Sequence, residues 1–218
     1  MTFQDFLQKQ DAIYNDFRSF MNDAKSNGCT IPKVESKTRH GFILSFDFGN
    51  QLQDIHIKIN TALETTPYKL LTFDILHSTV SVSKSNVELN DLTSINKIYA
   101  DFKNNLDSVS FEFREILYNA DSVILAGYPN NYYWQFCEAI VEQLNSQTTM
   151  EFRLPKMAHI TFARTFNQED VRLDENLIAE INEKLSPIEL PIKLKPKSLH
   201  LRQFEHSREG FTFRPISS

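Results

Sequence analysis

Glycine and cysteine are both scarce in this chain of 218 residues. The five glycines argue against a glycine-rich phosphate-binding loop and against flexible low-complexity linkers. The two cysteines, Cys29 and Cys137, lie far apart in the sequence and indicate neither a disulfide framework nor a cysteine-rich metal site. We therefore expect a reducing compartment, with the cytoplasm as the default.

Long apolar runs and an excess of positive charge are missing as well. There is no apolar run of about 18 residues and no signal-peptide pattern, so we expect no membrane association. A net charge of −5 does not suit a protein that coats a long nucleic acid. Residues 186–218 nevertheless carry six Lys/Arg against three Glu, which favours a small anionic ligand or, equally, a solvated strand face.

The hydrophobic patterns predict an α+β protein, and we expect it to be a monomer. Helical periodicity covers 3–26, 51–63, 91–105, 132–145 and 174–185. Strand patterns cover 41–48, 69–82 (one strand or a pair of strands), 109–113, 121–127, 156–164, 188–194, 198–204 and 210–214. The order strand, helix, strand, helix occurs twice, over 41–105 and 121–185, which predicts two lobes of similar build.

The third element of each repeat carries a His-x-Thr motif, His77/Thr79 in the first and His159/Thr161 in the second. Side chains two residues apart in a strand point to the same face, roughly 6.5–7 Å apart. Each histidine should therefore share a face with its threonine, while Ser78 and Ile160 point the other way.

Two such pairs suit phosphate chemistry. Histidine titrates near neutral pH, so one imidazole can act as a base and the other as an acid. A threonine hydroxyl can donate to a non-bridging phosphoryl oxygen. For either motif alone a structural histidine is the better interpretation, but the matched positions of the pair favour a metal-independent phosphoesterase. Which histidine is the acid stays open.

The segments HSTV (77–80) and HITF (159–162) resemble the two signatures of the two-histidine (2H) phosphoesterase superfamily. PKMAHITFAR (155–164) is most similar to the branch of RNA ligases and cyclic phosphodiesterases. The resemblance implies a bilobal fold over 41–218, with two antiparallel sheets lining a central cleft and helices outside. It also implies a 2′,3′-cyclic phosphate or a 2′,5′-linked nucleotide or short RNA as substrate. Residues 1–40 would be an N-terminal helical extension.

Further candidates surround the second motif. Simple alternation puts Arg164 on the face opposite His159, unless the strand bends and brings it to a phosphate; Lys156 is a similar case. Tyr128 and Tyr132 could line a base pocket, because aromatic rings stack on bases, although such clusters are more often core. Tyr133 and Trp134 belong to the same cluster.

The C-terminal segment offers another possible nucleotide contact. Phe204 and Phe211 flank a charged loop and could close over a base, with Arg202 or Arg208 reaching a phosphate.

No cofactor or metal is expected, since the spacing of His200, Glu205 and His206 matches no metal motif. Two other hypotheses remain. The chain could be a nucleotide-binding module that keeps the cleft without turnover. Alternatively, the two motifs could be coincidental in an α+β domain that binds a protein through helix 3–26.

Overall fold

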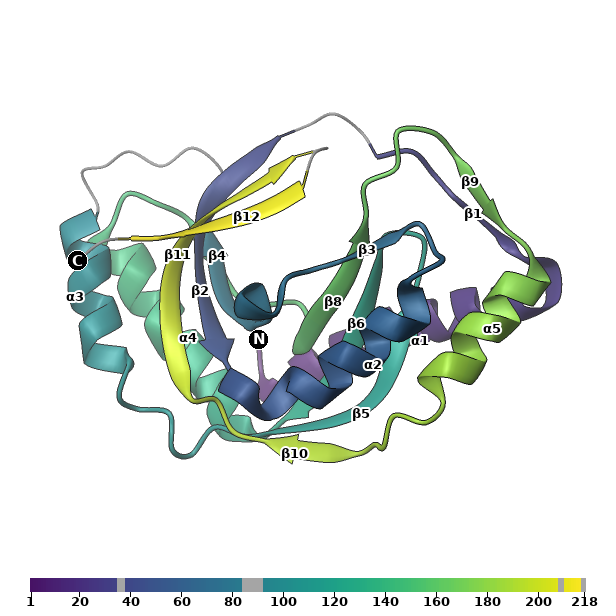
Figure 1. Ribbon diagram of the computed structural model, residues 1–218. Coiled ribbons are helices and arrows are strands. Elements are labelled where there is room, and N and C mark those ends of the chain that lie inside the picture. The colour runs from purple at the N-terminus through teal and green to yellow at the C-terminus, as the bar shows by residue number, and fades with distance from the viewer. Residues whose placement is uncertain (35–37, 84–91, 208–209, 217–218) are drawn as a thin grey trace.

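The computed structural model describes residues 1–34, 38–83, 92–207 and 210–216 (Figure 1). Its helices are α1 (Phe3–Asn27), α2 (Gln53–Leu63), α3 (Leu92–Phe102), α4 (Asn131–Gln147) and α5 (Glu175–Leu185). The longer strands are β2 (Arg39–Asp47), β4 (Ser78–Ser83), β5 (Phe111–Tyr118), β6 (Ser122–Pro129), β8 (His159–Thr165), β11 (Ser198–Ser207) and β12 (Gly210–Pro215). The short strands are β1 (Cys29–Ile31), β3 (Tyr68–Leu70), β7 (Phe152–Arg153), β9 (Val171–Leu173) and β10 (Ile192–Leu194).

The main sheet consists of two antiparallel halves joined at one point. Its strand order is β10-β5-β6-β8-β4-β2-β11-β12, with β3 beside β8 and β7 beside β4. The halves meet where β4 pairs with β8, and the only registered pair there is Ser78 with Ile160. This split sheet with helices outside it confirms the expected bilobal α+β fold (Figure 1).

The repeated element order is also confirmed. The first repeat is β2, α2, β4 and α3, and the second is β6, α4, β8 and α5. The segment 69–82, expected as one strand or a pair of strands, forms two strands. A 3-10 turn at Phe73–Ile75 separates β3 from β4, and it lets the flanking Leu71 and Leu76 both enter the core.

The prediction for 188–194 was too long, since only Ile192–Leu194 forms a strand. Pro191 has no N–H to donate to a ladder, so a strand cannot pair regularly through it. The pair β1 and β9 was not predicted at all, because three-residue strands carry too little alternation to detect.

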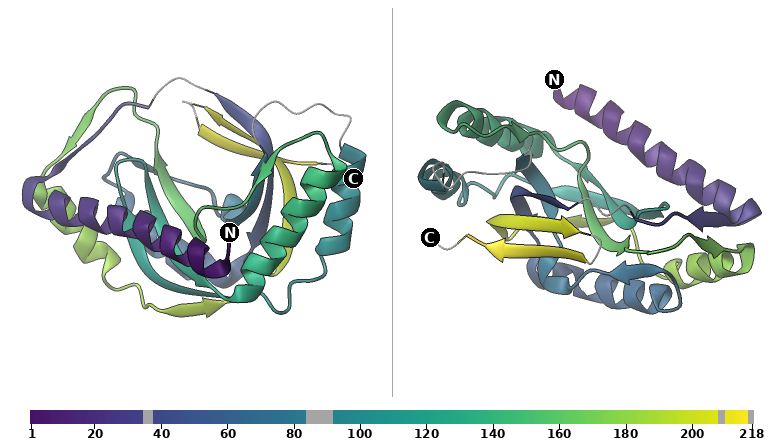
Figure 2. Two further views of the ribbon diagram at one scale, coloured as in Figure 1. Left: turned by 180° about the vertical axis from the view of Figure 1, so that it is seen from behind. Right: turned by 90° about the horizontal axis from the view of Figure 1, so that it is seen from above.

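Helix α1 crosses the half of the sheet that holds β5, β6 and β8 (Figure 2). It begins with a capping box between Thr2 and Asp5. It ends at Gly28, whose φ of +61° lies in the left-handed region, and whose close contact with Leu173 leaves no room for a Cβ. The ring of Phe6 is fully buried and stacks on Trp134 of α4, with the ring centroids 4.8 Å apart.

The packing of α1 predicts that Phe6→Ala destabilises the protein. Removing a fully buried ring leaves a cavity in the core and should cost about 3–5 kcal/mol of unfolding free energy. Urea denaturation would measure this loss. Ile57→Ala is the matched control, because Ile57 is 55% exposed, and it should change the unfolding free energy little. Equal effects of the two substitutions would contradict the packing role of α1.

Candidate active site

The two His-x-Thr motifs meet at the junction of the two sheet halves. Ser78 pairs with Ile160 in antiparallel register, so continuing that register by one residue sets His77 opposite Thr161 and His159 opposite Thr79. Ser78 and Ile160 are fully buried on the other face. Each histidine therefore lies beside its own threonine along the strand and across from the threonine of the other motif.

Both imidazoles are held by the same kind of backbone contact. Nδ1 of His77 lies 2.7 Å from the carbonyl oxygen of Ile75, and Nδ1 of His159 lies 3.4 Å from that of Met157. A carbonyl only accepts, so Nδ1 carries the proton in each neutral ring and Nε2 is the nitrogen with a free lone pair. The two motifs thus present the same tautomer.

All four motif side chains line one cavity of about 180 Å³. The rest of its wall is apolar or cationic and comes from Ile43, Leu71, Val82, Arg164, Phe204 and Phe211. Such a cavity offers two imidazoles, two hydroxyls and one guanidinium to a ligand, which is a donor set suited to an anion.

Burial lowers the pKa of both histidines to about 4. For His77 the nearby Arg202 and Arg164 add to this effect, and for His159 Arg164 does so. Both rings are therefore neutral at pH 7. A phosphate between them would oppose these causes and raise the pKa of the histidine that has to act as an acid.

Arg164 faces the cavity, contrary to simple alternation along β8. The pairing of β8 with β6 steps from Thr161–Ile124 to Ala163–Val123, so β8 contains one extra residue. Phe162 and Ala163 are consequently both buried. Such a bulge reverses the alternation beyond it and turns Arg164 to the side of Thr161.

Side chains outside the motifs hold the backbone on which the motif residues sit. The Tyr14 hydroxyl donates to the carbonyl of Ala158 over 2.6 Å, and the Ala158 N–H donates to Gln10 Oε1 over 2.7 Å. The Gly127 N–H also donates to the Ala158 carbonyl. A Cβ on Gly127 would lie 2.7 Å from that oxygen, so only glycine fits. These contacts fix the residue before His159.

Sequence reasoning missed Tyr14 and Gln10, and it also missed the contact of Tyr133, whose hydroxyl donates to the Thr79 carbonyl over 3.1 Å. The available signal was weak. Gln10 and Tyr14 are polar groups one helical turn apart on the stripe of α1 that Phe6 and Phe17 place against the sheet. A buried polar stripe requires acceptors or donors on the element it covers.

The tyrosines expected in a base pocket lie elsewhere. Tyr128 lies under α1, with its ring centroid 5.7 Å from that of Tyr14 and its hydroxyl accepting from Arg18. Tyr132 is 58% exposed at the start of α4. Trp134 is core, and Lys156 lines a separate apolar cavity beside α1.

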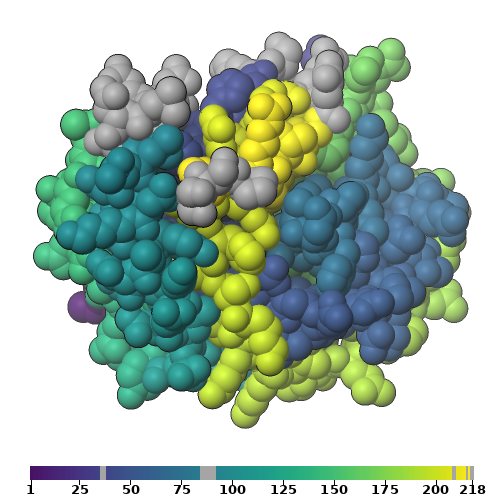
Figure 3. Space-filling view, turned by 60° about the vertical axis from the view of Figure 1, so that its left-hand side comes forward, coloured from purple at the N-terminus to yellow at the C-terminus, as the bar shows by residue number. Residues whose placement is uncertain are grey.

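The C-terminal strands do reach the cavity. Phe204 of β11 and Phe211 of β12 line it, and the ring of Phe213 meets that of His77 with centroids 5.0 Å apart. The Arg202 guanidinium lies 5.6 Å from the centroid of Phe213. Figure 3 shows this C-terminal segment as a surface band between α3 and α2. Arg208 lies outside the described residues.

The remaining histidines have other partners. His200 contacts Asp47 and Ser198, and His40 lies 3.9 Å from Glu205. Among the described residues, no group of three or more His, Cys, Asp or Glu is placed to hold a metal ion. None of the described helices is long and apolar enough to cross a membrane.

Comparison with solved structures identifies the fold. E. coli LigT complexed with ATP has a TM-score of 0.53 at 12% identity, covering 83% of this chain and 96% of LigT. TT0787 of Thermus thermophilus has a TM-score of 0.55 at 9% identity, covering 81% of this chain and 95% of that protein. A protein described as a phosphoesterase has a TM-score of 0.53 at 14% identity, covering 82% and 96% of the two chains.

No family model matches the sequence, and no curated protein is detectably similar to it. The similarity is therefore one of fold. These structures belong to the two-histidine phosphoesterases, so the resemblance expected from HSTV and HITF is confirmed at the level of the fold.

The lowered pKa values predict a loss of stability in mild acid. The histidine pKa is 6.5 without burial and about 4 in the fold, so the unfolded chain binds protons first as the pH falls. The free energy of unfolding therefore keeps its full value above pH 6.5 and falls as the pH drops towards 4. At pH 5 the loss is on the order of 2 kcal/mol per histidine. Urea denaturation at pH 7 and pH 5 would measure it.

The control for this experiment is a variant that cannot titrate at these positions. The double substitution His77→Gln/His159→Gln should lose clearly less unfolding free energy between pH 7 and pH 5 than the wild type does. His40→Gln, which alters an exposed histidine, should behave as the wild type. If all three proteins lose the same amount, the two cavity histidines are not buried as neutral rings.

Proposed function

We propose that the protein is a cytoplasmic phosphoric diester hydrolase acting on 2′,3′-cyclic phosphates or on 2′,5′-linked or cyclic nucleotides and short RNA. His77 and His159 would be the acid–base pair, and Thr79 and Thr161 would hold the phosphate. The observation that carries the proposal is the convergence of both motifs, in the same tautomer, on one cavity.

The reaction needs only groups of this chain and water. One Nε2 takes a proton from the water that attacks phosphorus, and the other imidazole, protonated, gives its proton to the ribose oxygen that leaves. The phosphorus–oxygen bond to water forms as the bond to the ribose oxygen breaks. The Thr79 and Thr161 hydroxyls and the Arg164 guanidinium donate to the non-bridging oxygens, whose charge is greatest in the transition state.

The diagonal arrangement of the motifs suits an in-line displacement. Because each histidine lies across from the other motif's threonine, a phosphate between the strands would have one imidazole at each end of its reaction axis. The substrate's negative charge would raise the pKa of the histidine that has to be protonated. The two histidines exchange roles when the reaction runs in reverse.

Two observations support a nucleotide as the carrier of the phosphate. Phe204 and Phe211 offer aromatic faces in the cavity wall, and bases stack on such faces. In addition, E. coli LigT, which has this fold, is solved in complex with ATP, with 3′-AMP and with NADP+.

Loss of either histidine should remove most of the activity. We expect His77→Ala and His159→Ala each to lower kcat by about 10²–10⁴-fold on the best substrate among 2′,3′-cyclic mononucleotides and 2′,5′-linked dinucleotides. His200→Gln is the control, because His200 does not line the cavity. Each assay is run both with and without EDTA. Activity that EDTA abolishes would contradict the metal-independent mechanism, and an inert wild type that binds these nucleotides would favour a binding module.

Loss of either threonine hydroxyl should weaken the hold on the phosphate. Thr79→Val and Thr161→Val keep the shape of the side chain but remove a donor to a charged oxygen, which should lower kcat/KM by roughly 10–100-fold. Steady-state kinetics would measure this drop. Thr61→Val on the exposed face of α2 is the control and should leave kcat/KM unchanged. Wild-type kcat/KM in both cavity variants would exclude a phosphate contact through these hydroxyls.

A further inference from the structure

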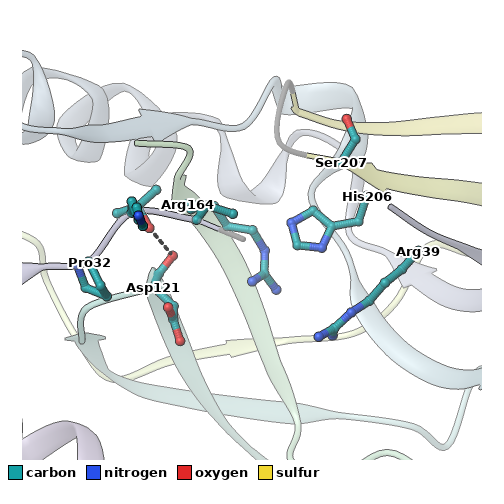
Figure 4. A pocket seen from close by; sticks show the side chains of 9 residues that line it. Pro32, Arg39, Asp121, Arg164, His206 and Ser207 are labelled. Atoms are coloured by element: carbon teal, nitrogen blue, oxygen red, sulfur yellow. Dashed lines mark hydrogen bonds between the residues drawn. The ribbon is translucent and has the colours of Figure 1, made fainter. Parts of the chain in front are cut away.

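A second cavity of about 330 Å³ adjoins the one with the two motifs. Its polar lining comes from segments far apart in the sequence: Lys33 after β1, Arg39 at the start of β2, Asp121 before β6, Arg164 and Thr165 on β8, and His206 and Ser207 at the end of β11. Figure 4 shows Arg164 and Asp121 on one side of this space, with Arg39 and His206 on the other.

Arg164 belongs to the walls of both cavities. A ligand group in the second cavity would therefore share this guanidinium with a phosphate held between His77 and His159. A third hollow, of about 540 Å³, shares Arg39 and His206 with the second cavity and Phe204 and Phe211 with the first. The hollows thus adjoin one another around the β11–β12 hairpin.

Among its described residues, the second cavity has more cationic groups than anionic ones. Burial, together with Arg164 and Arg39, lowers the pKa of His206. Burial also lowers the pKa of Arg164, with Arg39 acting in the same direction and Asp121 opposing it. Arg39 therefore lies close enough to Arg164 and to His206 to disfavour the charge of both side chains.

The guanidinium of Arg164 has no direct partner among the described residues. Within the described part of the chain its guanidinium donates no hydrogen bond and forms no salt bridge, although guanidinium groups in sheltered positions are normally paired. Asp121 is the one carboxylate among the described residues of the lining. Basic groups gathered in one cavity of an acidic protein form a site suited to an anion.

The geometry points to this second cavity as the subsite for an additional phosphate of an oligonucleotide substrate. The inference rests on the proposed function, since it takes the scissile phosphate to lie between the two motifs. It narrows the substrate class to nucleotide chains with at least two phosphates. In the bound substrate, the scissile phosphate and its neighbour would lie on either side of Arg164. Arg39, with His206 beside it, would bind that neighbouring phosphate.

The test compares one scissile bond with and without a second phosphate. The substrates are a 2′,3′-cyclic mononucleotide and a trinucleotide that ends in the same 2′,3′-cyclic phosphate, or a 2′,5′-linked dinucleotide and trinucleotide if that linkage is the one cleaved. We expect Arg39→Gln to reduce the trinucleotide preference in kcat/KM about tenfold, through KM, as is typical for a lost charged hydrogen bond. Lys193→Gln makes the same charge change on the exposed side chain of β10 and should leave the preference intact.

Several results would overturn the assignment. One is an equal drop in kcat/KM for both substrates in Arg39→Gln, which would indicate a structural role for Arg39. Another is an unchanged kcat/KM for both substrates. A third substrate, the 2′,3′-cyclic mononucleotide with a 5′-phosphate, separates the sources of the anion. If only this compound is sensitive to Arg39→Gln, the cavity binds a terminal phosphate and not an oligonucleotide.

Binding distinguishes failure of this inference from failure of the proposed function. If the wild type cleaves none of the substrates, the fluorescence anisotropy of a labelled 2′,5′-linked trinucleotide still measures affinity for the wild type and for Arg39→Gln. A dissociation constant about tenfold higher for the variant than for the wild type would support the phosphate subsite, even though the absence of cleavage would contradict the hydrolase proposal. Equal dissociation constants would refute the subsite.

Discussion

The pairing of Ser78 with Ile160 is the constraint on which the rest of the site depends. It is the one registered link between β4 and β8, and each of its members is flanked by a histidine and a threonine. A slip of one residue in either strand would send a whole motif to the opposite face, because side chains alternate along a strand. The tight burial of Ser78 and Ile160 in the core therefore fixes not only how the two halves join but also which four side chains share the cavity.

Rigid placement of the histidines comes from the backbone more than from their own contacts. Each ring is oriented by a carbonyl two residues earlier, so its direction depends on how well that local backbone is held. In the second motif Tyr14, Gln10 and Gly127 converge on Ala158. Hydrogen bonds inside the protein are strong where water is excluded, so this arrangement holds the backbone of the candidate site in place.

Much of the site could be predicted from the sequence, for a physical reason. His-x-Thr is a local pattern, and the strand periodicity around it is local as well, so the shared face of His159 and Thr161 followed from residues two positions apart. Arg164 did not follow, because an extra residue in β8 appears only in the pairing with β6. Tyr128 is a residue that the sequence wrongly suggested for the cavity. It shares a sheet face with Ala126, the partner of His159, but α1 covers that part of the face, and no local pattern reveals which helix covers a strand.

Helix α1 also bears on how the chain can be divided. In sequence, residues 1–40 read as an extension in front of a complete two-lobed unit, yet Tyr14 and Phe17 form a cluster with Leu117, Ile124 and Ala126 of the central strands. A fragment that began at residue 41 would expose this apolar surface to water together with the peptide groups of Gly127 and Ala158 that Tyr14 now meets. Exposed patches of this kind promote self-association. A shortened version of the protein for crystallisation or engineering should therefore keep its first helix and be trimmed elsewhere.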